Sequence, residues 1–195
     1  MTPPRRSVFL DRDGVIIENR PDHVKTWENV RFLDGSFEAL RRLADLPAAI
    51  VIVSNQGAVG RELMTLATAW ELQNRVVATI AREGGRIDAS YLCPHRPDEG
   101  CACRKPAPGM IRQAAQELQL DLSRSWLVGD AVSDLQAASA AGVRAILVRT
   151  GRGADQERLL TDRAAAHFAG QSEKAWLVVA DLPAAVDYLV RLFKE

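Results

Sequence analysis

The sequence predicts an α/β domain in which a mostly parallel sheet lies between two layers of helices. Short apolar runs alternate with longer stretches of helical periodicity along the whole chain, which is typical of this fold class. Polar residues follow several of the apolar runs directly, as they do where parallel strands end at a binding edge. No shift in composition marks a second domain. We therefore expect residues 1–195 to form a single Rossmann-like, three-layer domain.

The individual elements follow from local patterns. Strands are expected where apolar runs are short and bounded by polar residues, at residues 7–10, 48–53, 87–92, 125–128, 145–148 and 176–180. Helices are expected where apolar residues recur at helical spacing, at about residues 34–46, 65–83, 109–120, 132–141 and 181–193. Asp34 and Thr65 are predicted to cap the first two helices. The segment before residue 34 and the Cys- and Pro-rich segment that ends near Pro106 are expected to be irregular.

The amino-acid composition argues against some classes of binding partner. Of its 195 residues, 47% are hydrophobic and 26% are charged, and 25 Lys and Arg balance 25 Asp and Glu. This balance argues against nucleic acid or an anionic membrane as a partner. No apolar run approaches the ~20 residues of a membrane span, and no signal-type apolar segment opens the chain. We expect a cytoplasmic monomer that acts on a small molecule.

Chemically useful side chains follow the predicted strands at their carboxyl ends. In an open α/β sheet these ends meet at one edge, where ligands bind. Two acids follow the first strand, a hydroxyl and two amides follow the second, and two cations lie in the loop after the third. The fourth strand is followed by Gly and another acid. The residues expected at this edge are Asp11, Asp13, Ser54, Asn55, Gln56, Arg104, Lys105, Asp130 and Asp134.

This set of residues fits phosphoryl transfer. Asp11 and Asp13 are two residues apart, so on an extended chain they face the same way and repel each other. Mg²⁺ would relieve that repulsion, and Asp130 would complete its carboxylate ligands. One aspartate could then attack phosphorus while the other protonates the leaving alcohol. Taken alone, a D-x-D string could instead hold a metal for sugar-nucleotide transfer, and Gly129-Asp130 could be an ordinary turn.

The order of the motifs resembles a known superfamily. VFLDRDGVI, VIVSN, the Lys of CRKP and VGDAVSD are similar to the four motifs of the haloacid dehalogenase-like phosphatases. The resemblance implies that Asp11 is the nucleophile and Asp13 the general acid and base. It implies that Ser54 and Lys105 hold the transferring phosphate. By the same resemblance Mg²⁺ is bound by Asp11, the backbone carbonyl of Asp13 and Asp130.

A second motif holds all three cysteines of the chain. CPHRPDEGCAC supplies Cys93, His95, Cys101 and Cys103 with the spacing C-x-H-x₅-C-x-C. Four nitrogen and sulfur ligands without an open position are typical of a structural zinc site. Free thiols, or a strained disulfide between Cys101 and Cys103, are the alternatives. A zinc site here would also fix the direction of the two cations that follow Cys103.

The zinc loop followed by CRKP resembles one branch of the superfamily, whose members lack a large cap domain. This branch contains the heptose bisphosphate 7-phosphatases and the histidinol-phosphate phosphatases. The continuation CRKPAPGM and the length of the chain favour the heptose enzymes. The implied substrate is the 7-phosphate of D-glycero-D-manno-heptose 1,7-bisphosphate, with Asn55, Gln56 and Arg104 binding substrate. Histidinol phosphate, or a non-catalytic zinc-loop protein on the same fold, remains the alternative.

The sequence departs from the family pattern in three places. The family usually has Ser and Gly where Gly57 and Ala58 stand, in a loop that lines the substrate pocket. A Lys or Arg often follows the Gly-Asp of the fourth motif, but here the residue is Ala131. His23 stands where a Tyr is common. The resemblance therefore leaves one cation missing near the phosphate, and the substrate preference open.

Overall fold

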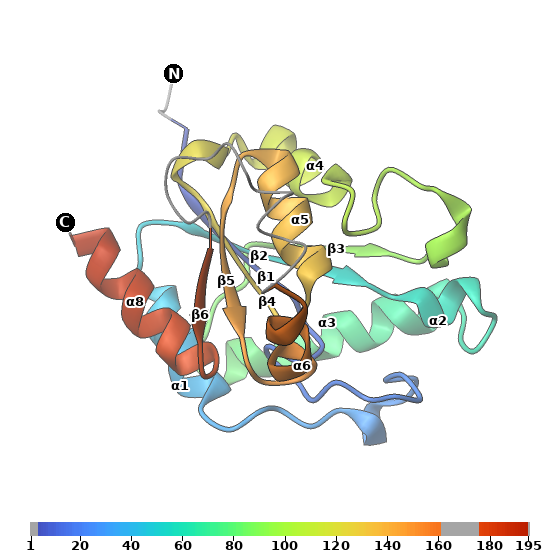
Figure 1. The fold of residues 1–195 in the computed structure, drawn as a ribbon. Coiled ribbons are helices and arrows are strands. Elements are labelled where there is room, and N and C mark those ends of the chain that lie inside the picture. The colour runs from blue at the N-terminus through green and yellow to red at the C-terminus, as the bar shows by residue number, and fades with distance from the viewer. Residues whose placement is uncertain (1–3, 161–175, 195) are drawn as a thin grey trace.

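The computed structural model describes residues 4–160 and 176–194, and its centre is one parallel sheet (Figure 1). The strand order is β3-β2-β1-β4-β5-β6, and every neighbouring pair is parallel. The strands are β1 (Ser7–Leu10), β2 (Ala49–Asn55), β3 (Ala89–Cys93), β4 (Trp126–Gly129), β5 (Arg144–Val148) and β6 (Trp176–Val179). All six predicted strands are confirmed, and β2 extends two residues beyond its predicted end.

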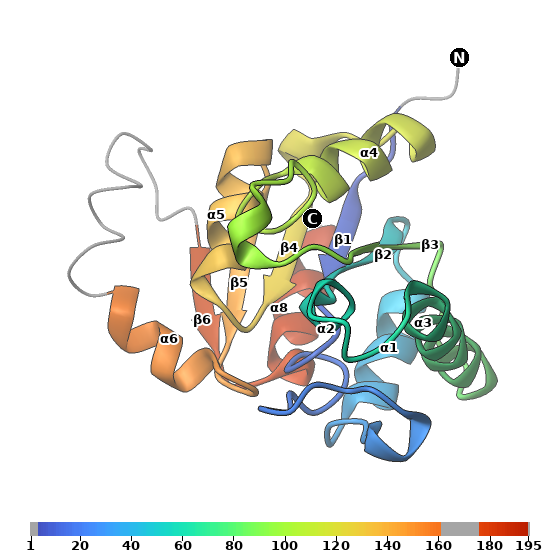
Figure 2. The ribbon, with the colours of Figure 1, turned by 90° about the vertical axis from the view of Figure 1, so that its right-hand side faces the viewer.

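The strands read as continuous apolar runs because helices cover both faces of the sheet. The helices are α1 (Ser36–Ala44), α2 (Gly57–Gly60), α3 (Leu66–Arg82), α4 (Gly109–Leu118), α5 (Val132–Ala141), α6 (Gly153–Leu159) and α8 (Leu182–Lys194). Three short 3₁₀ turns lie at Trp27–Asn29, Pro97–Glu99 and Leu122–Arg124. Apolar residues of α1, α3 and α8 pack on one face, and those of α4 and α5 pack on the other (Figures 1 and 2).

The side chains of β1 point alternately to the two faces of the sheet, so this strand contributes to both hydrophobic cores. Val8 and Leu10 belong to the core under α1, α3 and α8, whereas Phe9 belongs to the core under α4 and α5. All three side chains are fully buried. Since β1 lies between β2 and β4, the residues that follow it emerge at the middle of the sheet edge. This position places Asp11 at the centre of the fold's carboxyl edge.

One predicted cap is wrong and another is confirmed. Asp34 does not cap α1, because the helix begins after Gly35, which has a left-handed φ of 75°. A side chain at Gly35 would place its Cβ 2.7 Å from Pro183 of α8, so glycine fits this position for two reasons, its φ and the close approach of α8. Thr65 caps α3 as predicted, and its hydroxyl accepts a hydrogen bond from the Thr68 N–H at 3.0 Å.

Two helices were not predicted from the sequence. The glycine-bounded α2 has only four residues, too few to display a helical period. The other, α6, is mostly polar, so it has no apolar stripe to reveal it. Among the described residues, none of the helices is both long and apolar enough to cross a membrane.

Candidate active site

The carboxyl ends of β1 and β2 and the loop after β3 open into one cavity of about 620 Å³. Figure 2 shows this edge, with α2 and the loop after β3 beside the ends of β1, β2 and β4. Seven of the predicted site residues line the cavity: Asp11, Asp13, Asn55, Gln56, Arg104, Lys105 and Asp134. Ser54 and Asp130 lie just beneath them and are almost fully buried. The structure thus brings together the residues that the strand ends predicted.

Lys105 lies in the floor of this cavity between two carboxylates. Its Nζ is 3.0 Å from Asp11 Oδ1 and 2.6 Å from Asp134 Oδ1, and it donates to the Val53 carbonyl at 2.8 Å. The ammonium thus makes one hydrogen bond and two ion pairs. Burial would lower the pKa of Lys105, but the two carboxylates outweigh it and raise the pKa above its usual value. The ammonium is therefore a fixed positive charge beside Asp11.

Three buried carboxylates, two of them in contact with Lys105, crowd together at this edge. Burial raises the pKa of Asp11 to about 6, and neighbouring Asp134 and Asp13 add to the shift against the opposing effect of Lys105. Burial also raises the pKa of Asp130, with Asp11 contributing. Ligand oxygens of Asp11, Asp130 and Asp134 all lie within 4.8 Å of one another. This crowding of buried carboxylates favours a divalent cation between them.

Asp13 is held by a buried arginine that sequence reasoning missed. Arg12 is 1% exposed, and its Nη2 lies 2.9 Å and 3.1 Å from the two carboxylate oxygens of Asp13. Its backbone N–H donates to Asp11 Oδ1 at 2.8 Å. Strict strand alternation would point Arg12 away from both acids, but β1 has ended and the chain turns here. The signal that could have found it is an arginine flanked by two acids that need a partner.

The amides after β2 organise the site from its other side. Gln56 Nε2 donates to Asp13 Oδ2 and to Ser54 Oγ, both at 2.8 Å. Asn55 exchanges two hydrogen bonds with the backbone of Lys105, at 3.0 and 3.1 Å. The side chain of Asn55 therefore fixes the loop that carries Lys105, in addition to lining the cavity.

Gly14 makes room for Asp130. Its φ is +89°, and a Cβ at this position would lie 2.2 Å from Asp130 Oδ2. The Thr150 hydroxyl donates to the Gly14 carbonyl at 2.6 Å, which ties the turn after β5 to the Asp11 loop. The same turn carries Arg152, whose backbone N–H donates to Asp130 Oδ2 at 2.9 Å. Sequence reasoning did not identify Arg152.

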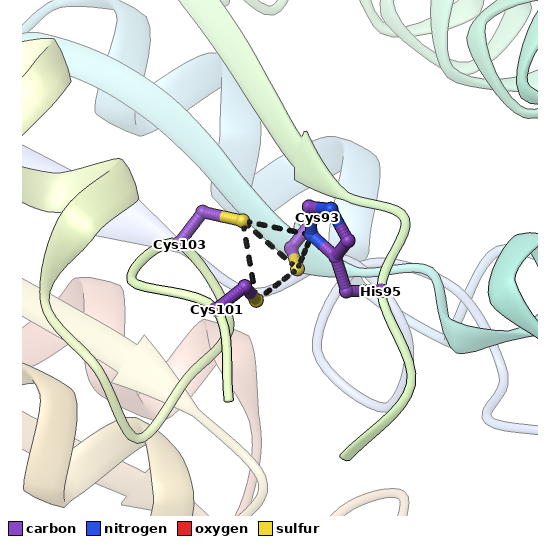
Figure 3. Close-up of side chains that lie close together, drawn as sticks. All are labelled: Cys93, His95, Cys101 and Cys103. Atoms are coloured by element: carbon purple, nitrogen blue, oxygen red, sulfur yellow. Dashed lines mark hydrogen bonds between the residues drawn. The ribbon is translucent and has the colours of Figure 1, made fainter. Parts of the chain in front are cut away.

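The cysteines and His95 form a compact cluster at the end of β3 (Figure 3). Five of the distances between the Sγ atoms and His95 Nδ1 lie between 3.2 and 3.6 Å. A tetrahedron with Zn–S bonds of ~2.3 Å has edges of about 3.8 Å, so this spacing fits one zinc ion. The disulfide alternative is wrong, because Cys101 Sγ and Cys103 Sγ are 3.5 Å apart and all three cysteines are free.

Two of the departures from the family pattern, Gly57 and His23, lie at the cavity. A Cβ at Gly57 would be 2.8 Å from Arg61 Nη1 and 3.2 Å from Arg104 Nη1, so this glycine lets two guanidinium groups converge. Arg104 Nη1 donates to the His95 carbonyl at 2.9 Å, which links it to the cysteine cluster. His23 lines the cavity with a left-handed φ of 65°. Burial and the Arg61 charge lower the pKa of His23.

Comparison with known proteins agrees with this geometry. A HAD-hydrolase-like family model matches residues 102–175. The D-glycero-beta-D-manno-heptose-1,7-bisphosphate 7-phosphatase of Pseudomonas putida is 40% identical over 146 residues, 75% of this chain and 83% of the relative. The Yersinia pestis protein of the same name is 36% identical over 198 residues, 95% of this chain and 97% of the relative.

A solved structure gives the same result in three dimensions. The D,D-heptose 1,7-bisphosphate phosphatase of Bordetella bronchiseptica, complexed with magnesium and phosphate, superposes with a TM-score of 0.84 at 35% identity. The match covers 96% of this chain and 99% of that one. The chain therefore belongs to the haloacid dehalogenase-like hydrolases, in the family of the D-glycero-beta-D-manno-heptose-1,7-bisphosphate 7-phosphatases.

Proposed function

We propose that this protein is a Mg²⁺-dependent phosphatase that removes the 7-phosphate of D-glycero-D-manno-heptose 1,7-bisphosphate through an aspartyl-phosphate on Asp11. The observation that carries the proposal is the buried group of Asp11, Asp130 and Asp134, two of which contact Lys105. A general binding protein has no need for three buried carboxylates crowded together beside an ammonium. A phosphatase needs them, because the reaction requires a nucleophile, a metal site and a fixed cation.

The residues present fit Mg²⁺. The clustered donors are the carboxylate oxygens of Asp11, Asp130 and Asp134, an all-oxygen set of the kind that Mg²⁺ prefers, and the family resemblance adds the backbone carbonyl of Asp13. Asp11 and Asp130 would hold the ion with that carbonyl. When bound, Mg²⁺ neutralises charge on the phosphoryl oxygens and polarises the phosphorus atom. Asp134, which accepts from the Ala131 N–H at 3.0 Å and pairs with Lys105, supports the site from below.

Side chains of this protein carry out nucleophilic attack, charge neutralisation and proton transfer. An Asp11 oxygen attacks phosphorus, and Lys105 neutralises negative charge as the bond forms. Asp13 donates a proton to the leaving sugar oxygen and then accepts one from the water that hydrolyses the acyl phosphate. Arg12 and Gln56 hold the Asp13 carboxylate where it can do both. The Ser54 hydroxyl donates to the phosphoryl group from beneath.

The charge around the cavity supports a bisphosphate substrate. The guanidinium groups of Arg61, Arg96 and Arg104 line the cavity on the side of α2 and the cysteine loop. A volume of about 620 Å³ accommodates a phosphorylated sugar of this size. A second phosphate would be attracted by these arginines, whereas the ammonium group of histidinol phosphate would be repelled. This electrostatic difference favours the heptose substrate over the amino alcohol.

Turnover of the two candidate substrates tests this choice. We expect kcat/KM for heptose 1,7-bisphosphate to exceed that for histidinol phosphate by about 100-fold or more, since two charge-assisted hydrogen bonds contribute roughly 3 kcal/mol. Phosphate release and the position of the remaining phosphate, followed by NMR, would measure both rate and regiochemistry. Faster turnover of histidinol phosphate would contradict the substrate and leave the chemistry standing. Absence of turnover with any phosphate monoester would favour the non-catalytic alternative.

Binding of Mg²⁺ can be tested without any substrate. At a Mg²⁺ concentration of ~100 times Kd, binding stabilises the folded protein by ~2.7 kcal/mol, which raises the Tm of a chain of this size by about 5–10 °C. Asp130→Asn should abolish this shift. Asp155→Asn, an exposed aspartate of α6, is the matched control and should keep it. A shift of equal size in the Asp130 variant would show that Mg²⁺ binds elsewhere.

We also propose the remaining features expected from the sequence. They are a single domain over residues 1–195 with a zinc loop at 93–103, a monomeric state, a cytoplasmic location, and no nucleic-acid or membrane partner. The equal numbers of acidic and basic residues support the absence of an anionic polymer as partner.

A further inference from the structure

Arg152 lies against Asp130 at the edge of the cavity. In addition to its backbone hydrogen bond, its Nη2 is 3.1 Å from Asp130 Oδ1 and its Nε is 3.4 Å from Asp130 Oδ2. Asp130 is fully buried, whereas the Arg152 side chain is 53% exposed. Arg152 also lines the cavity together with Asp11 and Asp13. The guanidinium therefore has one side on a buried acid and the other toward the space where substrate binds.

The turn that carries Arg152 is built into the site. Gly151 has a left-handed φ of +59°, and a Cβ there would lie 2.4 Å from Asp130 Oδ2 and 2.5 Å from the Gly14 Cα. The Thr150 hydroxyl is bonded to the Gly14 carbonyl. The backbone of residues 150–152 is thus pressed against two site segments at once. This contact fixes the base of the Arg152 side chain, while its exposed tip is free to change partner.

The position of Arg152 matters because the usual cation is missing. Ala131, at the place after the Gly-Asp motif where the resembling family often has Lys or Arg, is buried and uncharged. Arg152 lines the same cavity as Asp11, so a cation is present on this side of the site although position 131 supplies none.

We propose that Arg152 is the second phosphate-binding cation of this site, supplied from the turn after β5 in place of the side chain that Ala131 lacks. In the metal-free protein its guanidinium neutralises Asp130. When a divalent cation takes that carboxylate, the guanidinium donates its hydrogen bonds to the phosphoryl group instead. This inference rests on the proposed phosphatase function but not on the identity of the sugar, because inorganic phosphate is the product from any phosphate monoester.

Phosphate binding to the zinc-loaded protein in saturating Mg²⁺, measured by titration calorimetry, tests the proposal. Arg152→Ala should weaken binding of inorganic phosphate by about 10- to 100-fold, the value of one or two charge-assisted hydrogen bonds. Arg152→Lys should recover part of that loss. Arg149→Ala is the matched control, because Arg149 is three residues away, is 48% exposed and pairs with Glu157 outside the cavity. The Arg149→Ala variant changes the net charge by the same amount, and its Kd for phosphate should be within twofold of that of wild type.

Mg²⁺ binding in the absence of phosphate separates this role from a structural one. Since the guanidinium competes with the metal for Asp130, Arg152→Ala should bind Mg²⁺ at least as tightly as wild type. Equal weakening of Mg²⁺ and phosphate binding would mean that Arg152 only orients Asp130, which overturns the inference. The inference is also overturned if Arg152→Ala binds inorganic phosphate with a Kd within twofold of that of Arg149→Ala. A wild type that binds neither Mg²⁺ nor phosphate would instead overturn the proposed function itself.

Discussion

Replacing Asp11 with asparagine is expected to lower the rate of phosphate release by about 10⁴-fold or more, because the amide cannot form the covalent phosphoryl intermediate. The change is nearly isosteric. The asparagine carbonyl oxygen can still accept from the Arg12 N–H and from Lys105, which contact Asp11 Oδ1 at 2.8 and 3.0 Å. The loss would therefore report the nucleophile rather than a disturbed cavity.

The rate would be measured as initial release of phosphate from heptose 1,7-bisphosphate, with wild type and Asp155→Asn assayed in parallel. The Tm and zinc content of the Asp11 variant show whether it has folded. Inorganic phosphate binding, by calorimetry, shows whether the pocket survives. Activity within tenfold of wild type would mean that water attacks phosphorus directly, which would contradict the covalent mechanism while leaving the metal site unaffected.

The residues at the strand ends could be predicted because two simple rules determine them. Strands buried on both faces must be continuous apolar runs, so their ends are visible as the first polar residues. Parallel strands of one sheet present those ends at one edge. Asp11 and Asp130 are far apart in the sequence, yet these rules bring them into one neighbourhood, whereas Lys105 lies in a long loop after β3 and its place is indicated by the family motif. The structure adds their distances and the burial that raises the pKa of Asp11 and Asp130.

Arg12 and Arg152 could not be predicted by the same rules. Arg12 points toward the acids only because the chain leaves the extended conformation immediately after β1. Arg152 reaches Asp130 across 22 residues of sequence, through a turn whose path depends on close packing of Gly151 against Gly14. The flanking acids Asp11 and Asp13 are a local hint for Arg12, whereas no local pattern indicates the contact of Arg152. The cap predicted at Asp34 is wrong for a local reason, since Gly35 takes a left-handed φ and α1 begins after it.

Removal of the proposed zinc ion is expected to have the largest effect on stability. The loop from 94 to 102 contributes few apolar side chains, and most of its residues are exposed or half-exposed. Zinc sites in small peptides bind with ~10–16 kcal/mol, an energy comparable with the stability of a whole domain. Cys103→Ser should therefore lose zinc and lower the Tm by about 10 °C or more. Metal analysis and thermal unfolding would measure the two effects.

Loss of zinc should also reduce activity at temperatures where the protein remains folded. Cys103 lies two residues before Lys105, and Arg104 bonds the carbonyl of the ligand His95, so the metal fixes both cations through the backbone. Asp98→Ala is the matched control, because Asp98 lies in the same loop, is 64% exposed and is not a ligand. It should keep zinc and Tm; its rate is not the control, because Asp98 pairs with Arg96, which lines the cavity. A zinc-free Cys103→Ser protein with an unchanged Tm and full activity would contradict a structural metal here, and the cysteine cluster would then need another explanation.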